Sequence, residues 1–259
     1  MLKKERQFKY FIKYASAAKF HMDAFVKSQN AEELHKYRVE IKKIKAILAF
    51  NKIKDKSEVA ISLSVSANKA FQLAGEIRQF DIHLQIVNKF NLTEPVLNAK
   101  INKFRKLKIS KLKTFLAKHK EIFTKSDHNL IKHLKNFDND KIIKKIEHKI
   151  TEIKNILTYH YKNPEQLHEA RKQIKKLFYV EQILPGRVRS KLNLNLEYLD
   201  TLQHSIGEWH DLFVTENDLK AESLKYNVSL AKLKNARRDQ LKKLQQKFKR
   251  FKKKVQLTN

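Results

Sequence analysis

Two stretches of the chain are near copies of one another: residues 34–50 are LHKYRVEIKKIKAILAF and residues 167–183 are LHEARKQIKKLFYVEQI. Both have the form LHxxRxxIKK, and the shared residues recur at an offset of 133. A second pair, GEIRQFDI at 75–82 and GEWHDLFV at 207–214, recurs at an offset of 132. Two matches at nearly one offset indicate duplicated halves. We therefore expect a single domain over 1–259, with internal repeats at about 1–135 and 136–259.

The repeated stretches have the periodicity of amphipathic helices. At about 100° per residue, apolar residues such as Ile41 and Ile44 fall on one side of the first helix. The opposite side carries cations and imidazoles: His35, Arg38, Lys42 and Lys45 in the first copy, and His168, Arg171 and Lys175 in the second, flanked by Lys172 and Lys176. The same basic stripe thus occurs twice.

The composition predicts an all-α protein. Three Gly and three Pro in 259 residues cannot supply the turns that hairpins or doubly wound sheets require. Breaks in the apolar periodicity predict antiparallel helices. Their expected ranges are 3–27, 31–50 after a cap at Asn30, 57–90, 95–123, short pieces in 127–137, 140–159, a helix from Asn163–Pro164 to Pro185, 188–212, and 229 to the basic tail.

The charge favours a polyanionic partner. There are 57 Lys and Arg against 27 Asp and Glu, a net charge of +30, and such self-repulsion is usually tolerated when the partner is a polyanion. The alternative is that compositional drift produced the excess and that the stripes are solvated helix faces. Only 10 of the 57 cations are Arg, yet Arg38 and Arg171 occupy equivalent positions. An Arg fork favours bidentate contact with phosphate or carboxylate oxygens.

Other motifs point away from an enzyme. The glycines at 75, 186 and 207 cannot form a phosphate-binding loop, and acidic metal ligands are not clustered. We therefore expect no catalytic residues and no cofactor. His204 and His210, six residues apart, would lie on opposed helix faces, which disfavours a metal site with Asp211. Asp81 and Asp211 either orient Arg78 and His210 or cap a helix.

The two ends of the chain carry further signals. The N-terminal MLKKERQFKYFIKY lacks the apolar segment of a signal peptide, and no apolar run reaches the roughly 20 residues of a membrane span. These features predict a cytoplasmic location. In the C-terminal KFKRFKKK, Phe248 and Phe251 either pack on the helices beneath solvated lysines, or stack on nucleic-acid bases or contact an anionic membrane.

The paired His-x-x-Arg-x-x-x-Lys motifs, each followed by a Gly-containing segment, resemble the CHAD domain, the conserved histidine α-helical domain. The resemblance covers essentially the whole chain. It implies two antiparallel four-helix bundles related by a pseudo-twofold axis around a central basic groove that binds inorganic polyphosphate, and it implies an association with polyphosphate granules. The implied polyphosphate-binding residues are His35, Arg38, Lys42, Lys43, Lys45 and Arg78 in the first repeat, and His168, Arg171, Lys172, Lys175, Lys176 and His210 in the second.

The sequence also departs from the family pattern. Phe178 stands where a basic residue is common, so the second stripe is shorter than the first. Arg78 is followed by Gln79 where the family usually has an Arg-Asp pair. We expect His35 and His168 to donate neutral N–H bonds to phosphate or to become protonated on binding. The alternative is that each packs at the seam of the bundle and bonds a backbone carbonyl. Two alternatives stay open: a nucleic-acid-binding helical protein, for which Tyr179 lies close to the second stripe, and a regulatory or recruiting subunit of a polyphosphate-metabolising enzyme.

Overall fold

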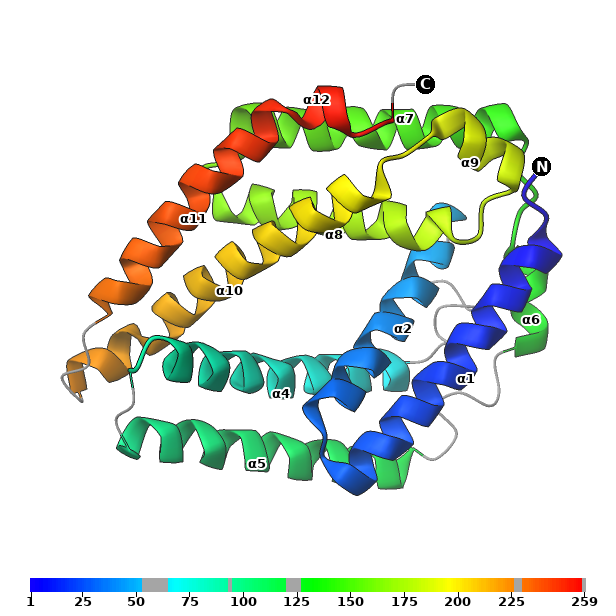
Figure 1. Ribbon diagram of the computed structural model, residues 1–259. Helices are drawn as coiled ribbons and strands as arrows, with labels where there is room; N and C mark the ends of the chain where they lie inside the picture. Colours follow the sequence, from blue (N-terminus) through cyan, green and yellow to red (C-terminus); the bar gives the residue numbers. More distant parts are fainter. Residues whose placement is uncertain (53–64, 93–94, 120–126, 226–229, 258–259) are drawn as a thin grey trace. The chain divides into compact units, whose positions relative to one another are not determined.

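The computed structural model describes residues 1–52, 65–92, 95–119, 127–225 and 230–257 (Figure 1). Helices dominate these residues, which contain no β-strand, and an isolated β-bridge joins Leu194 to Gln256. The prediction of an all-α protein is confirmed. The elements are α1 (Lys4–Ser28), α2 (Ala31–Phe50), α4 (Val65–Lys89), α5 (Pro95–Lys118), α6 (Asp127–His133), α7 (Asn139–Asn155), the π-helical turn η1 (Ile156–His160), α8 (Pro164–Glu181), α9 (Gly186–Leu192), α10 (Leu196–Lys225), α11 (Ala231–Lys249) and α12 (Phe251–Lys254).

The chain forms two compact units, which we describe separately. The N-terminal unit comprises residues 2–85 and 95–136, and the C-terminal unit comprises residue 1, residues 86–94 and residues 137–259. The helices expected over 3–27, 31–50 and 140–159 are present within one residue of their predicted bounds, and α2 begins and ends where it was expected. The helix expected to reach about residue 123 ends at Lys118, and the one expected to reach Pro185 ends at Glu181. Residues 57–64, part of one expected helix, lie outside the described residues.

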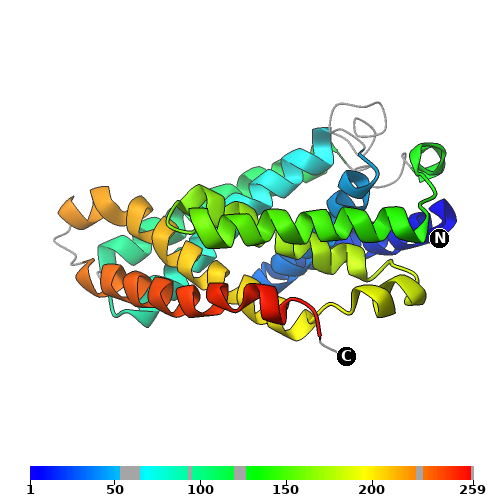
Figure 2. The same cartoon turned by 90° about the horizontal axis from the view of Figure 1, so that it is seen from above.

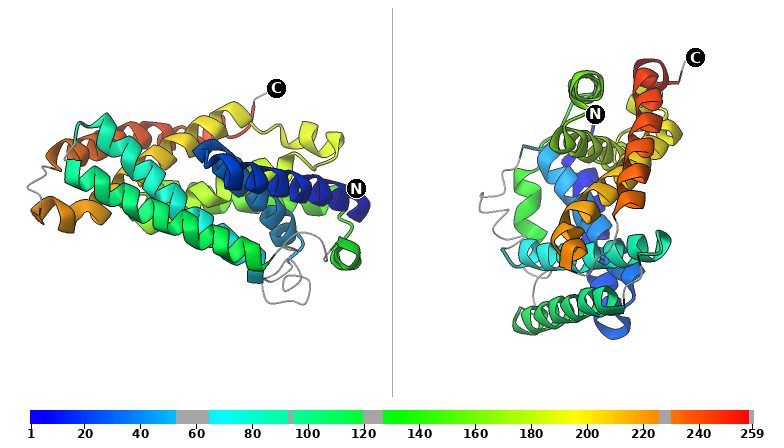
Figure 3. Two further views of the ribbon diagram at one scale, coloured as in Figure 1. Left: turned by 90° about the horizontal axis from the view of Figure 1, so that it is seen from below. Right: turned by 90° about the vertical axis from the view of Figure 1, so that its left-hand side faces the viewer.

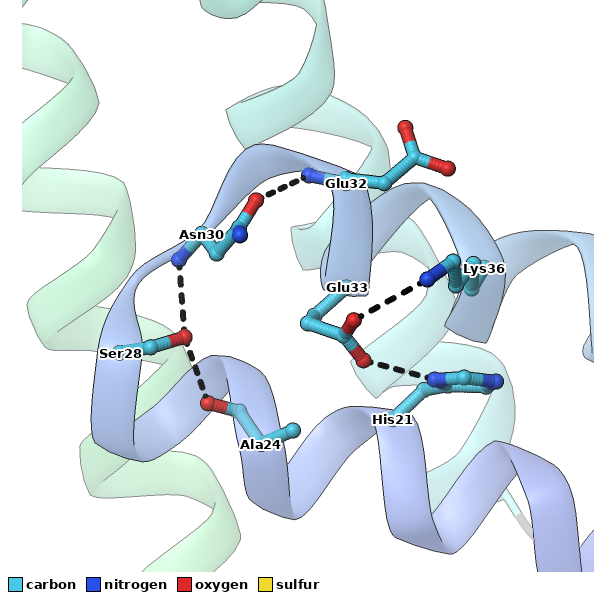
Figure 4. Close-up of polar contacts among 7 residues, drawn as sticks. All are labelled: His21, Ala24, Ser28, Asn30, Glu32, Glu33 and Lys36. Carbon is cyan, nitrogen blue, oxygen red and sulfur yellow. Dashed lines mark hydrogen bonds and ion pairs between the residues drawn. The ribbon is translucent and has the colours of Figure 1, made fainter.

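The N-terminal unit begins with an antiparallel hairpin of α1 and α2, whose turn is fixed by local hydrogen bonds (Figure 4). Gln29 adopts the left-handed conformation, with φ at 55°, and ends α1. The Asn30 side chain accepts a hydrogen bond from the Glu32 backbone N–H at 2.8 Å, which confirms the predicted N-cap of α2. Ser28 links the two ends, because its hydroxyl donates to the Ala24 carbonyl and accepts from the Asn30 N–H.

Glu33 ties α2 back to α1 beside this turn. Its carboxylate lies 2.7 Å from His21 Nδ1 on α1 and 3.3 Å from Lys36 Nζ on α2 (Figure 4). The hydrogen bond from His21 is the main reason why the pKa of Glu33 lies below its usual value. The interior of the hairpin is apolar and includes the fully buried Phe11, Phe25, Leu34, Tyr37, Ile44 and Ile47.

The second hairpin of the N-terminal unit pairs α4 with α5, which lie side by side (Figures 1 and 3). Arg105 of α5 donates from Nε to the buried carboxylate of Asp81 on α4 at 2.6 Å, and Lys108 forms an ion pair with Glu76 one turn away. Arg105 also reaches the Gln29 carbonyl at 3.5 Å. The contacts with Asp81 and Glu76 fix the register of α5 against α4. The contact with Gln29 places α5 beside the turn between α1 and α2.

In the C-terminal unit, the helix expected over residues 140–159 changes its hydrogen bonding near its end, where α7 gives way to η1. Asn163 then caps α8: its side chain accepts from the backbone N–H groups of Glu165 and Gln166, and Pro164 occupies the first turn. The helices α10 and α11 form the next hairpin (Figure 2). Trp209, at the middle of α10, is fully buried in this unit.

The prediction of one helix over residues 188–212 is wrong. The chain breaks at Asn193, whose φ of 43° is left-handed, and α10 starts only at Leu196. The cause is a contact with the end of the chain, because Leu257 N–H donates to the Asn193 carbonyl at 2.8 Å and Asn195 N–H donates to Val255 at 3.0 Å. The Asn193 side-chain amide donates to the Leu257 carbonyl as well. Such a contact leaves no mark in the local periodicity.

The C-terminal basic segment is folded onto the C-terminal unit. Phe248 and Phe251 are buried, whereas the neighbouring Lys249, Arg250 and residues 252–254 are exposed. The first of the two interpretations of this segment is therefore confirmed: the rings pack and the cations are solvated. None of the described helices combines the length and apolarity that crossing a membrane would require.

Candidate anion-binding site

Arg38 connects the two repeated motifs of the first half. From α2, its Nη1 donates to the Phe71 carbonyl of α4 at 2.7 Å, and its guanidinium carbon lies 4.4 Å from the centre of the Phe71 ring. The guanidinium lies directly against Gly75, because a Cβ atom built there would approach Nη1 to 2.6 Å. Arg38 is thus held against the backbone of α4.

The C-terminal unit repeats this contact. Arg171 of α8 donates from Nε to the Gln203 carbonyl of α10 at 3.3 Å. A Cβ atom at Gly207 would come within 2.5 Å of Nη2, 2.8 Å of Cζ and 2.9 Å of Nε. In both units the arginine therefore covers a helical glycine and bonds the carbonyl four residues before it.

The two repeated motifs, LHxxRxxIKK and the glycine segment, therefore contact one another within each unit. The offset of 133 relates Arg38 to Arg171 on the first helix of each pair, and the offset of 132 relates Gly75 to Gly207 on the second. The carbonyl acceptors, Phe71 and Gln203, also differ by 132. The sequence identified both motifs but not that they touch within each unit.

Burial makes these guanidinium groups unusual. It is the main cause that lowers the pKa of Arg38 to about 10, with the charge of Arg78 acting in the same direction and Tyr37 opposing it. Burial also lowers the pKa of Arg171, while Asp211 and Tyr179 oppose that shift. Each arginine is a half-buried cation that donates to a neutral carbonyl.

The third position of the site differs between the units. One turn after Gly75 stands Arg78, and the equivalent residue after Gly207 is His210. The His210 ring lies against that of His168, with the ring centres 4.1 Å apart. Burial, followed by the nearby His168 and Arg171, lowers the pKa of His210 to about 4, so this imidazole is neutral at pH 7. The predicted His168, Arg171 and His210 therefore do come together.

The far end of the stripe also differs. In the N-terminal unit, Lys45 Nζ lies 4.4 Å from the centre of the Phe71 ring, which Arg38 also contacts, so two cations contact one aromatic ring. In the C-terminal unit the equivalent positions hold Phe178 and Gln203. The C-terminal unit thus has an aromatic residue, Phe178, where the N-terminal unit has Lys45, and it has Gln203 where the N-terminal unit has Phe71. The predicted shortening of the second stripe is consistent with this exchange.

The remaining predicted residues divide into two groups. His35, Lys42 and Lys175 are half-buried on the same helices as the arginines. Lys43 instead forms an ion pair with Glu40 at 2.6 Å and lies 5.0 Å from the centre of the Tyr14 ring, on the α1 side of α2. Lys172 is paired with Glu169, and Lys176 is exposed. Acids thus do neutralise Lys43 and Lys172, which the pattern of the stripes did not predict.

Sequence analysis missed a second pair of arginines. Arg105 bonds Asp81, and Arg237 bonds the buried Glu216 from α11 to α10, both at 2.6 Å. Asp81 therefore serves Arg105 rather than Arg78 or a helix cap. The signal was present, because Arg105 and Arg237 are separated by 132 residues, the same offset as the glycine motifs.

The arrangement offers cations, and the neutral imidazole of His210, on rigid helices. No group of three His, Cys, Asp or Glu side chains in the described part of the chain is placed to hold a metal ion. Anion binding is the chemistry that this donor set can perform, since Arg, Lys and imidazole N–H groups all donate to phosphate oxygens.

Comparison with known proteins gives one match. Residues 10–220 match the family model of the CHAD domain, which is more than half of the chain. No match was found among curated proteins or among solved structures. The match includes both LHxxRxxIKK helices and both glycine segments that they contact. On this evidence, the chain belongs to the CHAD domain family.

Proposed function

We propose that this protein binds inorganic polyphosphate without catalysing its turnover. The proposed contacts centre on Arg38 and Arg171. The other members are His35, Lys42, Lys45 and Arg78 in the N-terminal unit, and His168, Lys175, Lys176 and His210 in the C-terminal unit. CHAD membership is consistent with a polyphosphate-related role. Lys43 and Lys172, which acids already neutralise, contribute less.

One observation carries the proposal: each unit holds a half-buried guanidinium against a glycine, where it donates to a backbone carbonyl. Removing a charge from water is unfavourable unless a counter-charge accompanies it. A bound phosphate group would supply that counter-charge and accept from the N–H groups that the carbonyl does not use. The site is therefore organised for an anion before the anion arrives.

A linear polyphosphate suits these sites better than a compact anion. It carries about one negative charge per unit and has no bases to recognise, so cations on rigid helices suffice. Chain length tests this proposal. If one polymer engages both units, long chains will bind more tightly than short ones by effective concentration alone.

The direct experiment is titration of the wild type and of Arg38→Ala/Arg171→Ala with polyphosphates of graded length at fixed salt. We expect the double variant to lose about tenfold or more in affinity, because each lost charge-assisted hydrogen bond is worth roughly 1.5–3 kcal/mol. Lys103→Ala/Lys144→Ala is the matched control, since it removes the same charge from exposed positions on α5 and α7. Equal losses in the two double variants would contradict the site.

Competition with RNA at the same salt separates polyphosphate from nucleic acid. Single-strand binders stack bases on exposed aromatic rings. Phe248 and Phe251 are buried, and Phe71 is covered by Arg38 and Lys45. We therefore expect polyphosphate to displace RNA, and stronger displacement by RNA of similar charge would reject the proposal.

A further inference from the structure

The glycines of this chain are few, and their positions are informative. There are three, and two of them, Gly75 and Gly207, lie inside long helices. Glycine is the least favourable residue except proline in a helix interior. None of the three has a positive φ, so backbone conformation does not require glycine at these positions. Space for a neighbouring group is the remaining reason.

That neighbour is the arginine in both cases. At Gly75 a methyl group would meet Nη1 of Arg38 at 2.6 Å, and at Gly207 it would overlap three atoms of the Arg171 guanidinium at 2.5–2.9 Å. At Gly186 no atom lies within 4 Å of the same hypothetical Cβ. The two helix-interior glycines thus face a guanidinium at closer than contact distance, and the third faces open space.

We infer that Gly75 and Gly207 are positioning residues of the polyphosphate site, an inference that rests on the proposed function. Each glycine lets a guanidinium lie flat on the backbone of the second helix, where a carbonyl fixes one N–H group and the plane of the fork is set. The remaining N–H groups then meet phosphate oxygens with their direction already fixed.

A positioning role predicts a loss of binding without a loss of folding. The atoms that a methyl group would meet belong to the end of a flexible side chain, so the arginine will move aside while the helices stay paired. Alanine also raises helix propensity. We therefore expect Gly75→Ala/Gly207→Ala to keep the helical circular dichroism and a Tm near that of the wild type, but to bind polyphosphate about tenfold or more weakly.

The glycine and arginine substitutions should act through one contact. On the Arg38→Ala/Arg171→Ala background, adding Gly75→Ala/Gly207→Ala should change affinity little, because the group that it displaces is already gone. The slope of log affinity against log salt should fall by about the same amount in either double variant, as expected when the same cations leave the phosphates. Gly186→Ala is the control and should bind as the wild type does.

A second variant addresses the orientation directly and leaves the glycines intact. Arg38→Lys/Arg171→Lys keeps the charge but lacks the planar fork. If the glycines serve to seat that plane, the lysine variant will lose several-fold in affinity while folding normally.

The outcomes separate the two proposals. Failure of the wild type to bind polyphosphate would overturn the proposed function and this inference together. If Gly75→Ala/Gly207→Ala and Arg38→Lys/Arg171→Lys both bind polyphosphate as tightly as the wild type does, only the positioning role is overturned. A glycine variant that fails to fold leaves the decision to the lysine variant.

Discussion

At the scale of single residues, His210 shows how the two halves have diverged. Its counterpart in the first repeat, Arg78, is a permanent cation beside Arg38. His210 instead lies among His168, Arg171 and buried surface, and its pKa is lowered to about 4. The N-terminal unit thus presents a fixed charge at the position where the C-terminal unit presents a group whose charge depends on pH.

This difference predicts a pH dependence of stability. The unfolded chain takes up a proton on His210 near pH 6.5, but the folded protein does so only near pH 4. The contribution of neutral His210 is therefore complete above about pH 6.5 and is lost as the pH falls towards 4. Urea unfolding of the wild type should show a lower free energy of unfolding at pH 5 than at pH 7. We expect this decrease to be smaller by roughly 1–2 kcal/mol in His210→Gln. His148→Gln, at an exposed position, is the control; an unchanged pH dependence in His210→Gln would contradict the assignment.

At the scale of helices, one arginine–carboxylate pair in each unit joins two neighbouring long helices. Arg105 bonds Asp81 between α5 and α4, and Arg237 bonds Glu216 between α11 and α10. The arginines are 132 residues apart, but their partners are not: Asp81 would correspond to position 213, one turn before Glu216. Both units thus join these two helices by an arginine–carboxylate pair, but the carboxylate stands one turn later in the C-terminal unit.

The pair in the C-terminal unit can be tested by removing one partner or both. Arg237→Met leaves the Glu216 carboxylate buried without its partner, and we expect a loss of about 3 kcal/mol in the free energy of unfolding. Arg237→Met/Glu216→Leu should recover much of that loss, because no buried charge remains. Lys242→Met, which breaks an exposed pair with Asp239 at 3.9 Å, should change stability by less than about 0.5 kcal/mol. If Arg237→Met is as stable as Arg237→Met/Glu216→Leu, the unpaired Glu216 carboxylate does not destabilise the fold and this prediction is wrong.

The break between α9 and α10 is another element-scale feature, and its conformation is measurable. Asn193 has a φ of 43°, which asparagine and glycine tolerate and β-branched residues do not. We expect Asn193→Val to lower the free energy of unfolding by roughly 1–3 kcal/mol, and Asn193→Gly to change it much less. Thermal unfolding of the two variants is the measurement. Equal Tm values would mean that the continuous helix over residues 188–212 forms at little cost.

At the scale of the whole molecule, the net charge of +30 acts on folding and on binding in opposite directions. Salt screens repulsion among the cations, so the Tm of the isolated protein should rise between about 0.05 and 0.5 M NaCl. Over the same range the affinity for polyphosphate should fall steeply, because releasing counterions into a more concentrated salt solution is less favourable. Differential scanning fluorimetry and titration at matched salt concentrations check both signs. An affinity that does not depend on salt would rule out a site based on cations.

The sequence by itself determined the helical class, the cap at Asn30, the helix start at Asn163–Pro164, and the duplication that singles out Arg38 and Arg171. These features are readable because apolar periodicity, capping chemistry and repetition are local properties of a chain.

Only the tertiary structure decided which repeated groups touch. It placed each arginine on a glycine 36 or 37 residues away, gave Asp81 to Arg105, and broke the helix at Asn193 against the chain terminus. Contacts between residues distant in the chain depend on how whole helices pack. No periodicity records them, and charge alone does not distinguish a buried guanidinium from a solvated one.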